Sequence, residues 1–148
     1  MDYHRLHRQS EATARPTILV VDDQVDLRDA IAVLLETEGY DVVDASNGDE
    51  ALKYLSSAAS HVAAIVLDLA MPVMDGWQFL AERQKHPALK DIPTIVVTGV
   101  SEPKRRDEEL GDIVVFTKPF HFDDLIRELR QALDAHKRAK PAAVDFQQ

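Results

Sequence analysis

The feature that most limits what this chain can fold into is a set of short, almost entirely apolar runs at residues 17–21, 62–67 and 93–97. Strands with one face in water alternate apolar and polar residues, whereas strands covered on both faces are apolar throughout. The three runs do not alternate. We therefore predict that they are interior strands of a parallel sheet with helices on both sides.

Apolar residues recur at helical spacing between these runs, which predicts a helix after each strand. The first helix would pass through Leu27 and Leu35 and end at Gly39, and Asn47 with Glu50 resembles a capping box that opens the second. The remaining predicted elements are strands at 40–45 and 113–117, a helix at 75–86 and an amphipathic last helix from Phe122 through Leu133. Five strands alternating with helices predict an α/β fold with a doubly wound, five-stranded parallel sheet.

Polar residues follow four of the predicted strands. Asp22 and Asp23 follow the first strand, Asp68 the third, Thr98 the fourth and Lys118 the fifth. Each of these residues could also have a purely structural role, since an aspartate can cap a helix and the others can be turn or solvated residues. Ligands bind in such sheets at the carboxyl ends of the strands, near the point where strand order reverses. Because all five residues would meet at that edge, we favour a functional site over five separate structural roles.

The residue types at this edge suit one kind of chemistry. Three carboxylates brought together repel one another unless they are protonated or bridged by a cation. Oxygen ligands without histidine or cysteine favour Mg²⁺ before Ca²⁺ or Mn²⁺, and the chain has no cysteine. A lysine and a hydroxyl beside the metal would neutralise the oxygens of a transferring phosphoryl group, and a carboxylate can act as the nucleophile.

Charge and hydropathy argue against two other classes of partner. The formal net charge of −9 argues against a nucleic-acid surface, and we expect the one basic run, residues 136–140, to be a solvated helix end. The longest apolar run is far shorter than the roughly 20 residues that span a bilayer. Residues 1–16 lack the apolar core of a secretory signal. We therefore expect a cytoplasmic protein with no direct nucleic-acid contact and no membrane insertion.

Four segments repeat a known pattern, in a known order. They are Val20-Val21-Asp22-Asp23, Leu67-Asp68-Leu69-Ala70-Met71-Pro72-Val73-Met74-Asp75-Gly76, Val97-Thr98-Gly99 and Thr117-Lys118-Pro119-Phe120. These segments resemble the signature blocks of receiver domains in the response regulators of two-component signalling. The resemblance implies a flavodoxin-like or CheY-like fold for residues 17–138. Residues 1–16 would then be a flexible arm and residues 139–148 a tail, with no second domain after them.

The resemblance also implies roles for the acidic residues. Asp68 would be the phosphoacceptor. Mg²⁺ would be bound by the carboxylates of Asp23 and Asp68, by Asp22 through a water molecule, and by the backbone carbonyl of Ala70. The chain would then be a phosphoacceptor signalling domain and not an enzyme, because it catalyses only its own phosphorylation and slow dephosphorylation.

By the same resemblance, Thr98 and Lys118 would contact the phosphoryl oxygens, and the Lys118–Pro119 peptide bond would be cis. The donor would be a phosphohistidine on a sensor histidine kinase or on a histidine phosphotransfer protein of a phosphorelay. Output would pass through contact with a downstream protein target. A stand-alone regulator and a part of a hybrid kinase both remain open.

Two features depart from the pattern of that family. Val115 stands three residues before Lys118, where the family usually has an aromatic switch residue, and Phe116 faces the opposite side of its strand. Residues 102–109 are mostly charged where an apolar helical stripe is expected, which predicts a short or irregular fourth helix. We hypothesise that activation orders residues 101–110 and does not rotate a buried ring.

Two alternatives compete with this interpretation. A phosphohydrolase of the haloacid-dehalogenase kind also forms an aspartyl phosphate, but it normally has a second acid two residues after the nucleophile, where this chain has Ala70. A pseudo-receiver would keep the fold without accepting a phosphoryl group. The complete set of five polar residues argues against the pseudo-receiver.

Overall fold

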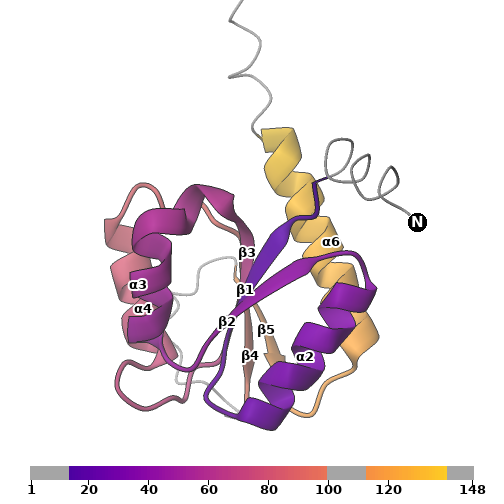
Figure 1. Ribbon diagram of the computed structural model, residues 1–148, viewed down its shortest axis with the longest axis horizontal. Coiled ribbons are helices and arrows are strands. Elements are labelled where there is room, and N and C mark those ends of the chain that lie inside the picture. Colours follow the sequence, from indigo (N-terminus) through magenta and orange to yellow (C-terminus); the bar gives the residue numbers. More distant parts are fainter. Residues whose placement is uncertain (1–13, 100–112, 140–148) are drawn as a thin grey trace, which may run out of the picture.

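The computed structural model describes residues 14–99 and 113–139, which form a parallel sheet flanked by helices (Figure 1). The elements are β1 (Thr17–Val21), α2 (Val25–Thr37), β2 (Asp41–Ala45), α3 (Gly48–Ala58), the 3₁₀ turn η1 (Ala59–His61), β3 (Val62–Leu67), α4 (Gly76–Lys85), β4 (Thr94–Thr98), β5 (Val114–Thr117) and α6 (Phe122–Ala139). The predicted doubly wound α/β fold with five parallel strands is confirmed. The short or irregular helix that we predicted between β4 and β5, and with it the segment 101–110, lies outside the described residues.

Strand order places the crevice of the sheet beside β1. The order is β2-β1-β3-β4-β5, and β1 pairs in parallel with both β2 and β3. The chain therefore moves outward from β1 to β2 and then returns to the other side of β1 for β3. In open α/β sheets, ligands bind outside the carboxyl ends of the strands at such a reversal. Asp22 and Asp68 directly follow the two strands that flank it.

Helices cover both faces of the sheet, which explains why its strands are apolar without alternation. In Figure 1, α2 and α6 lie on one face and α3 and α4 on the other. Leu19 belongs to the core cluster on the α3 and α4 face, and Ile18 and Val20 to the cluster on the α2 and α6 face. Val115 and Phe116 of β5 pack against these two clusters respectively. The prediction that they face opposite sides of the sheet is confirmed.

The helix ends follow local sequence signals. Gly39 has a φ of 104°, a left-handed conformation that glycine adopts easily, and it ends α2 as predicted. The Asn47 side chain accepts from the backbone N–H of Glu50 at 2.9 Å and begins α3. Asp75 and Gln78 form a complete capping box at the start of α4. The helices that follow β2 and β3 therefore begin at fixed positions.

Three strands begin one residue later than predicted. β4 begins at Thr94 because Pro93 has no N–H to donate, although its carbonyl accepts from Ile65 N at 2.8 Å. β2 begins at Asp41 and β5 at Val114. None of the described helices is long and apolar enough to cross a membrane.

Candidate functional site

Three carboxylates meet at the carboxyl end of the sheet. Oxygens of Asp22, Asp23 and Asp68 lie within 4.8 Å of one another. Asp22 N–H donates to the Ala45 carbonyl at 3.1 Å and Asp68 N–H to the Val21 carbonyl at 2.9 Å, which extends the strand pairing by one residue on each side. Asp22 and Asp68 are buried and Asp23 is exposed. The cluster is therefore rigid at its base and open on one side.

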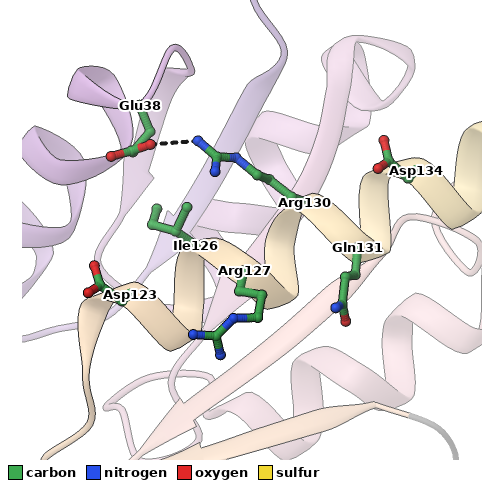
Figure 2. A pocket seen from close by; sticks show the side chains of 7 residues that line it. All are labelled: Glu38, Asp123, Ile126, Arg127, Arg130, Gln131 and Asp134. Carbon is green, nitrogen blue, oxygen red and sulfur yellow. Dashed lines mark hydrogen bonds and ion pairs between the residues drawn. The ribbon is translucent and has the colours of Figure 1, made fainter.

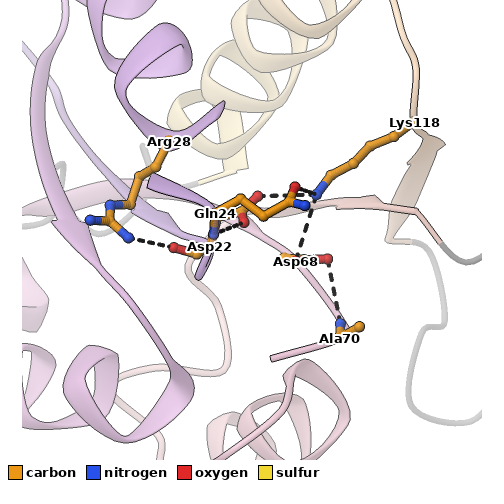
Figure 3. Close-up of polar contacts among 6 residues, drawn as sticks. All are labelled: Asp22, Gln24, Arg28, Asp68, Ala70 and Lys118. Carbon is orange, nitrogen blue, oxygen red and sulfur yellow. Dashed lines mark hydrogen bonds and ion pairs between the residues drawn. The ribbon is translucent and has the colours of Figure 1, made fainter. Parts of the chain in front are cut away.

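Lys118 reaches this cluster from the end of β5 (Figure 3). Its Nζ lies 3.2 Å from Asp22 Oδ2 and 3.6 Å from Asp68 Oδ2. The backbone N–H of Lys118 donates to the Thr98 carbonyl at 2.8 Å, which joins the ends of β4 and β5. The Lys118–Pro119 peptide bond is cis, as predicted. One ammonium group thus faces two buried carboxylates.

Thr98 and Ala70 complete the predicted set. Thr98 is completely buried at the end of β4, the strand between those that carry Asp68 and Lys118. Ala70 is exposed, and its backbone N–H points to Asp68 Oδ1 at 3.4 Å. The structure therefore brings all the residues named from the sequence to one edge of the sheet.

The electrostatics of the cluster are unbalanced. Burial, and then the neighbouring charge of Asp22, raise the pKa of Asp68 from 3.8 to about 6, against the lowering effect of Lys118. Among residues 14–99 and 113–139, three carboxylates and one lysine at this edge leave an excess of negative charge. A divalent cation would offset that excess, and the donors present are the oxygens that Mg²⁺ prefers. The residues therefore fit a magnesium site.

A glycine lets the helix after Asp68 come close to it. A Cβ at Gly76 would overlap the carbonyl oxygen of Asp68 and the Cα of Leu69. Gly76 N–H instead donates to the Leu69 carbonyl at 2.8 Å. Within the same loop, Val73 has a φ of 67°, a left-handed conformation that costs free energy for a β-branched residue. The loop after Asp68 is tightly folded and locally strained.

Sequence reasoning missed two residues at this edge. Gln24 accepts from Lys118 Nζ at 3.1 Å through its Oε1. Arg28 donates from Nη1 to the Asp22 carbonyl at 2.7 Å, and its Nε lies 3.5 Å from Asp44 Oδ2. In the sequence, both look like ordinary polar residues at the start of a helix. The only sequence signal is that glutamine stands at the N-cap of α2, where short polar residues are favoured.

Away from this edge, a hollow of about 450 Å³ lies between α6 and the end of α2 (Figure 2). Arg130 crosses it to Glu38, with an Nη2 to Oε1 distance of 2.6 Å. The residues that line it are Glu38, Asp123, Ile126, Arg127, Arg130, Gln131 and Asp134. The hollow contains no member of the acidic cluster, and its polar side chains carry charges of both signs.

Comparisons with known proteins agree with this geometry. The family model described as "Response regulator receiver domain" matches residues 18–130. The probable transcriptional regulator ycf27 of Porphyridium aerugineum is 36% identical over 118 residues, which are 78% of this chain and 47% of that protein. The chain spans about half the length of the first curated relatives it matches.

Two solved structures show the same fold. The signal receiver domain of a signal transduction histidine kinase from Syntrophus aciditrophicus has a TM-score of 0.76 at 30% identity, with 88% of this chain and 99% of that chain covered. The chemotaxis response regulator CheY4 of Vibrio cholerae has a TM-score of 0.71 at 28% identity, with 80% and 98% covered.

Proposed function

This chain belongs to the response regulator receiver domain family, and we propose that Asp68 is its phosphoacceptor. Membership makes the chain a phosphoacceptor domain of two-component signalling. Position in the sheet supports the choice of Asp68 over its neighbours: β3, which leads into it, lies between β1, which leads into Asp22 and Asp23, and β4, which ends at Thr98. Asp68 is a buried carboxylate that has the Lys118 ammonium 3.6 Å away and two further carboxylates within 4.8 Å. A phosphoryl group on Asp68 would therefore lie between a fixed cation and a candidate metal site.

Mg²⁺ would be held by the carboxylates of Asp23 and Asp68, by Asp22 through a water molecule and by the Ala70 carbonyl. The all-oxygen donor set and the excess negative charge at this edge support that assignment. When bound, the ion supplies positive charge that offsets the charge on the phosphoryl oxygens.

The residues of this chain would act in one displacement. A carboxylate oxygen of Asp68 attacks the phosphorus of a phosphohistidine, the P–N bond breaks, and the electron pair returns to the imidazole nitrogen. Lys118 donates to a phosphoryl oxygen, and the Thr98 hydroxyl contacts another. In the slow dephosphorylation, water attacks the phosphorus, the P–O bond to Asp68 breaks, and phosphate leaves. The chain would thus act only on itself.

The phosphoryl donor would be a sensor histidine kinase or a histidine phosphotransfer protein in the cytoplasm. Output would pass to a downstream protein target through surface contact and without direct nucleic-acid binding. The net charge of −9 supports the last point, because clustered basic residues are what nucleic-acid phosphates require. Residues 17–138 would form the receiver, preceded by the arm and followed by the tail.

Intact mass after incubation with acetyl phosphate and Mg²⁺ tests the proposal. We expect one added phosphoryl group, lost on treatment with hydroxylamine and absent when EDTA is present, because acyl phosphates are labile and the metal site must be filled. Asp68→Asn should not gain the group. Asp29→Asn, which changes an exposed aspartate of α2, is the matched control and should label like wild type. Equal labelling of Asp68→Asn would show that the assignment is wrong.

A further inference from the structure

We propose that Gln24 is a positioning residue for phosphoryl transfer, because its carboxamide oxygen holds the Lys118 ammonium group beside Asp68. This inference rests on the proposed function. Figure 3 shows the Gln24 side chain extended toward Lys118, and the Nζ to Oε1 distance is 3.1 Å. The two residues are 94 positions apart in the sequence, so the contact depends on the assembled sheet edge.

This contact and two further hydrogen bonds form a closed ring. Gln24 N–H donates to Asp22 Oδ1 at 2.8 Å. Lys118 Nζ donates to Asp22 Oδ2 at 3.2 Å and to Gln24 Oε1 at 3.1 Å. Asp22 and Gln24 therefore fix each other, and together they fix the ammonium group. The ring joins the loop after β1 to the loop after β5.

The Gln24 side chain is free for this task because it does not cap its helix. Gln24 is the N-cap residue of α2, with extended backbone angles (φ −86°, ψ 106°), and its side chain makes no capping hydrogen bond. Serine, threonine, asparagine or aspartate would turn back to a helix N–H at this position. The longer glutamine side chain instead reaches Lys118 at the carboxyl edge of the sheet.

The chemistry of lysine explains what the contact contributes. A lysine ammonium has three N–H donors on a flexible stem, so its position is set by its acceptors. Asp22 and Gln24 are both at hydrogen-bonding distance, and Asp68 Oδ2 lies slightly farther away, at 3.6 Å. A neutral amide oxygen holds the ammonium group without adding negative charge. A glutamate here would also hold it, but it would repel the incoming phosphoryl anion.

Gln24 would therefore affect the rates of both reactions at Asp68. With acetyl phosphate, an Asp68 oxygen attacks the phosphorus, the P–O bond to acetate breaks, and acetate leaves with the electron pair. In hydrolysis, water attacks the phosphorus and the electron pair of the breaking bond returns to Asp68. In each transition state an ammonium group already in place needs less reorganisation to face the phosphoryl oxygens.

Gln24→Met and Gln24→Glu test this role, because both keep the side-chain length. Methionine removes the amide oxygen, so phosphorylation by acetyl phosphate and hydrolysis of the phosphoprotein should each slow about fivefold, the factor expected for one ordinary hydrogen bond. Glutamate should slow phosphorylation through charge repulsion while keeping Lys118 in place. Val25→Ala changes the next residue, which is exposed, and should leave both rates unchanged.

A second readout needs no metal and no phosphoryl donor. The Lys118 ammonium protons of ¹⁵N-labelled protein should exchange with solvent faster in Gln24→Met than in wild type, and no faster in Gln24→Glu. Slower transfer with faster ammonium exchange supports the proposal. Unchanged rates in Gln24→Met, or slower rates with unchanged exchange, would overturn it, as would equal slowing in Val25→Ala. If wild type fails to label, the proposed function itself fails.

Discussion

The two ends of the parallel sheet handle charge in different ways. At the amino end, Arg15 donates to Asp41 Oδ1 at 3.0 Å and to the carbonyls of Glu36 and Tyr40 at 3.0 and 2.8 Å. The charge there is matched within the fold. At the carboxyl end, three carboxylates share one lysine, and the pKa of Asp68 is raised to about 6. The charge there is not matched within the described residues.

This difference indicates which end carries function. A charged group that only stabilises the fold is paired by the fold itself, as Arg15 is. Asp68 is buried without full compensation, which costs folding free energy and favours binding of a cation or a phosphoryl group. Perturbed carboxylates in a crevice are functional candidates for this reason. The carboxyl end is therefore the candidate functional end of the sheet.

The largest expected effect is on the stability of the metal-free protein. A pKa raised from 3.8 to about 6 corresponds to roughly 3 kcal/mol by which ionised Asp68 opposes folding. Asp68→Asn should therefore raise the free energy of unfolding at pH 8 by up to about that amount, measured by urea denaturation with EDTA. At the amino end, Asp41→Asn should lower it by at most about 1 kcal/mol, because that pair is exposed.

The stabilisation by Asp68→Asn should depend on pH. The folded state binds a proton at Asp68 more readily than the unfolded state does, so the penalty is complete above pH 6 and is lost as pH falls toward 3.8. The advantage of Asp68→Asn over wild type should shrink over that window. If Asp68→Asn destabilises the protein as Asp41→Asn does, the contrast between the two ends is wrong.

Magnesium should stabilise the protein through the carboxyl end only. An ion that binds the folded state alone adds about 2.7 kcal/mol at a concentration one hundred times its Kd. We expect Mg²⁺ to raise the urea midpoint of wild type and of Asp41→Asn, but to have little effect on Asp23→Asn. Equal stabilisation of all three proteins would place the ion elsewhere.

Backbone strain gives a smaller prediction. Val73 lies in the loop after Asp68 with a φ of 67°, and the residue is 79% exposed. Asparagine tolerates this conformation better, so Val73→Asn should raise the free energy of unfolding by about 1 kcal/mol. Val33→Asn, at an exposed position within α2, should lower it slightly or leave it unchanged. A loss of stability in Val73→Asn would mean that Val73 is not strained.

Features that depend on local sequence patterns could be predicted, and features that depend on the assembled structure could not. The strands, the topology class and the convergence of Asp22, Asp68 and Lys118 depend on apolar patterning and on residues that directly follow strands. The contacts of Gln24 depend on where a side chain points after the sheet has assembled, which no local pattern records. The conformation of Val73 was also missed, because nothing in the run Met71-Pro72-Val73-Met74 requires a positive φ.

The smallest expected signal comes from the fluorescence of Trp77. This residue lies in the first turn of α4, directly after Gly76, and packs against the core cluster on that face of the sheet. Gly76 is close to the Asp68 carbonyl, so binding at Asp68 should change the fluorescence of this single tryptophan. Titration with Mg²⁺ and then beryllofluoride would show this. A flat titration with binding proven by calorimetry would rule out Trp77 as a probe.

The central claim is that Asp68 carries the phosphoryl group, and chemical mapping of the modified residue tests it most directly. Borohydride reduces an aspartyl phosphate to homoserine, which leaves a permanent mass change at the position that was phosphorylated. After treatment with acetyl phosphate and Mg²⁺, reduction and proteolysis, peptide sequencing by mass spectrometry should find homoserine at position 68 alone. Homoserine at Asp22 or Asp23, with position 68 unchanged, would contradict the account.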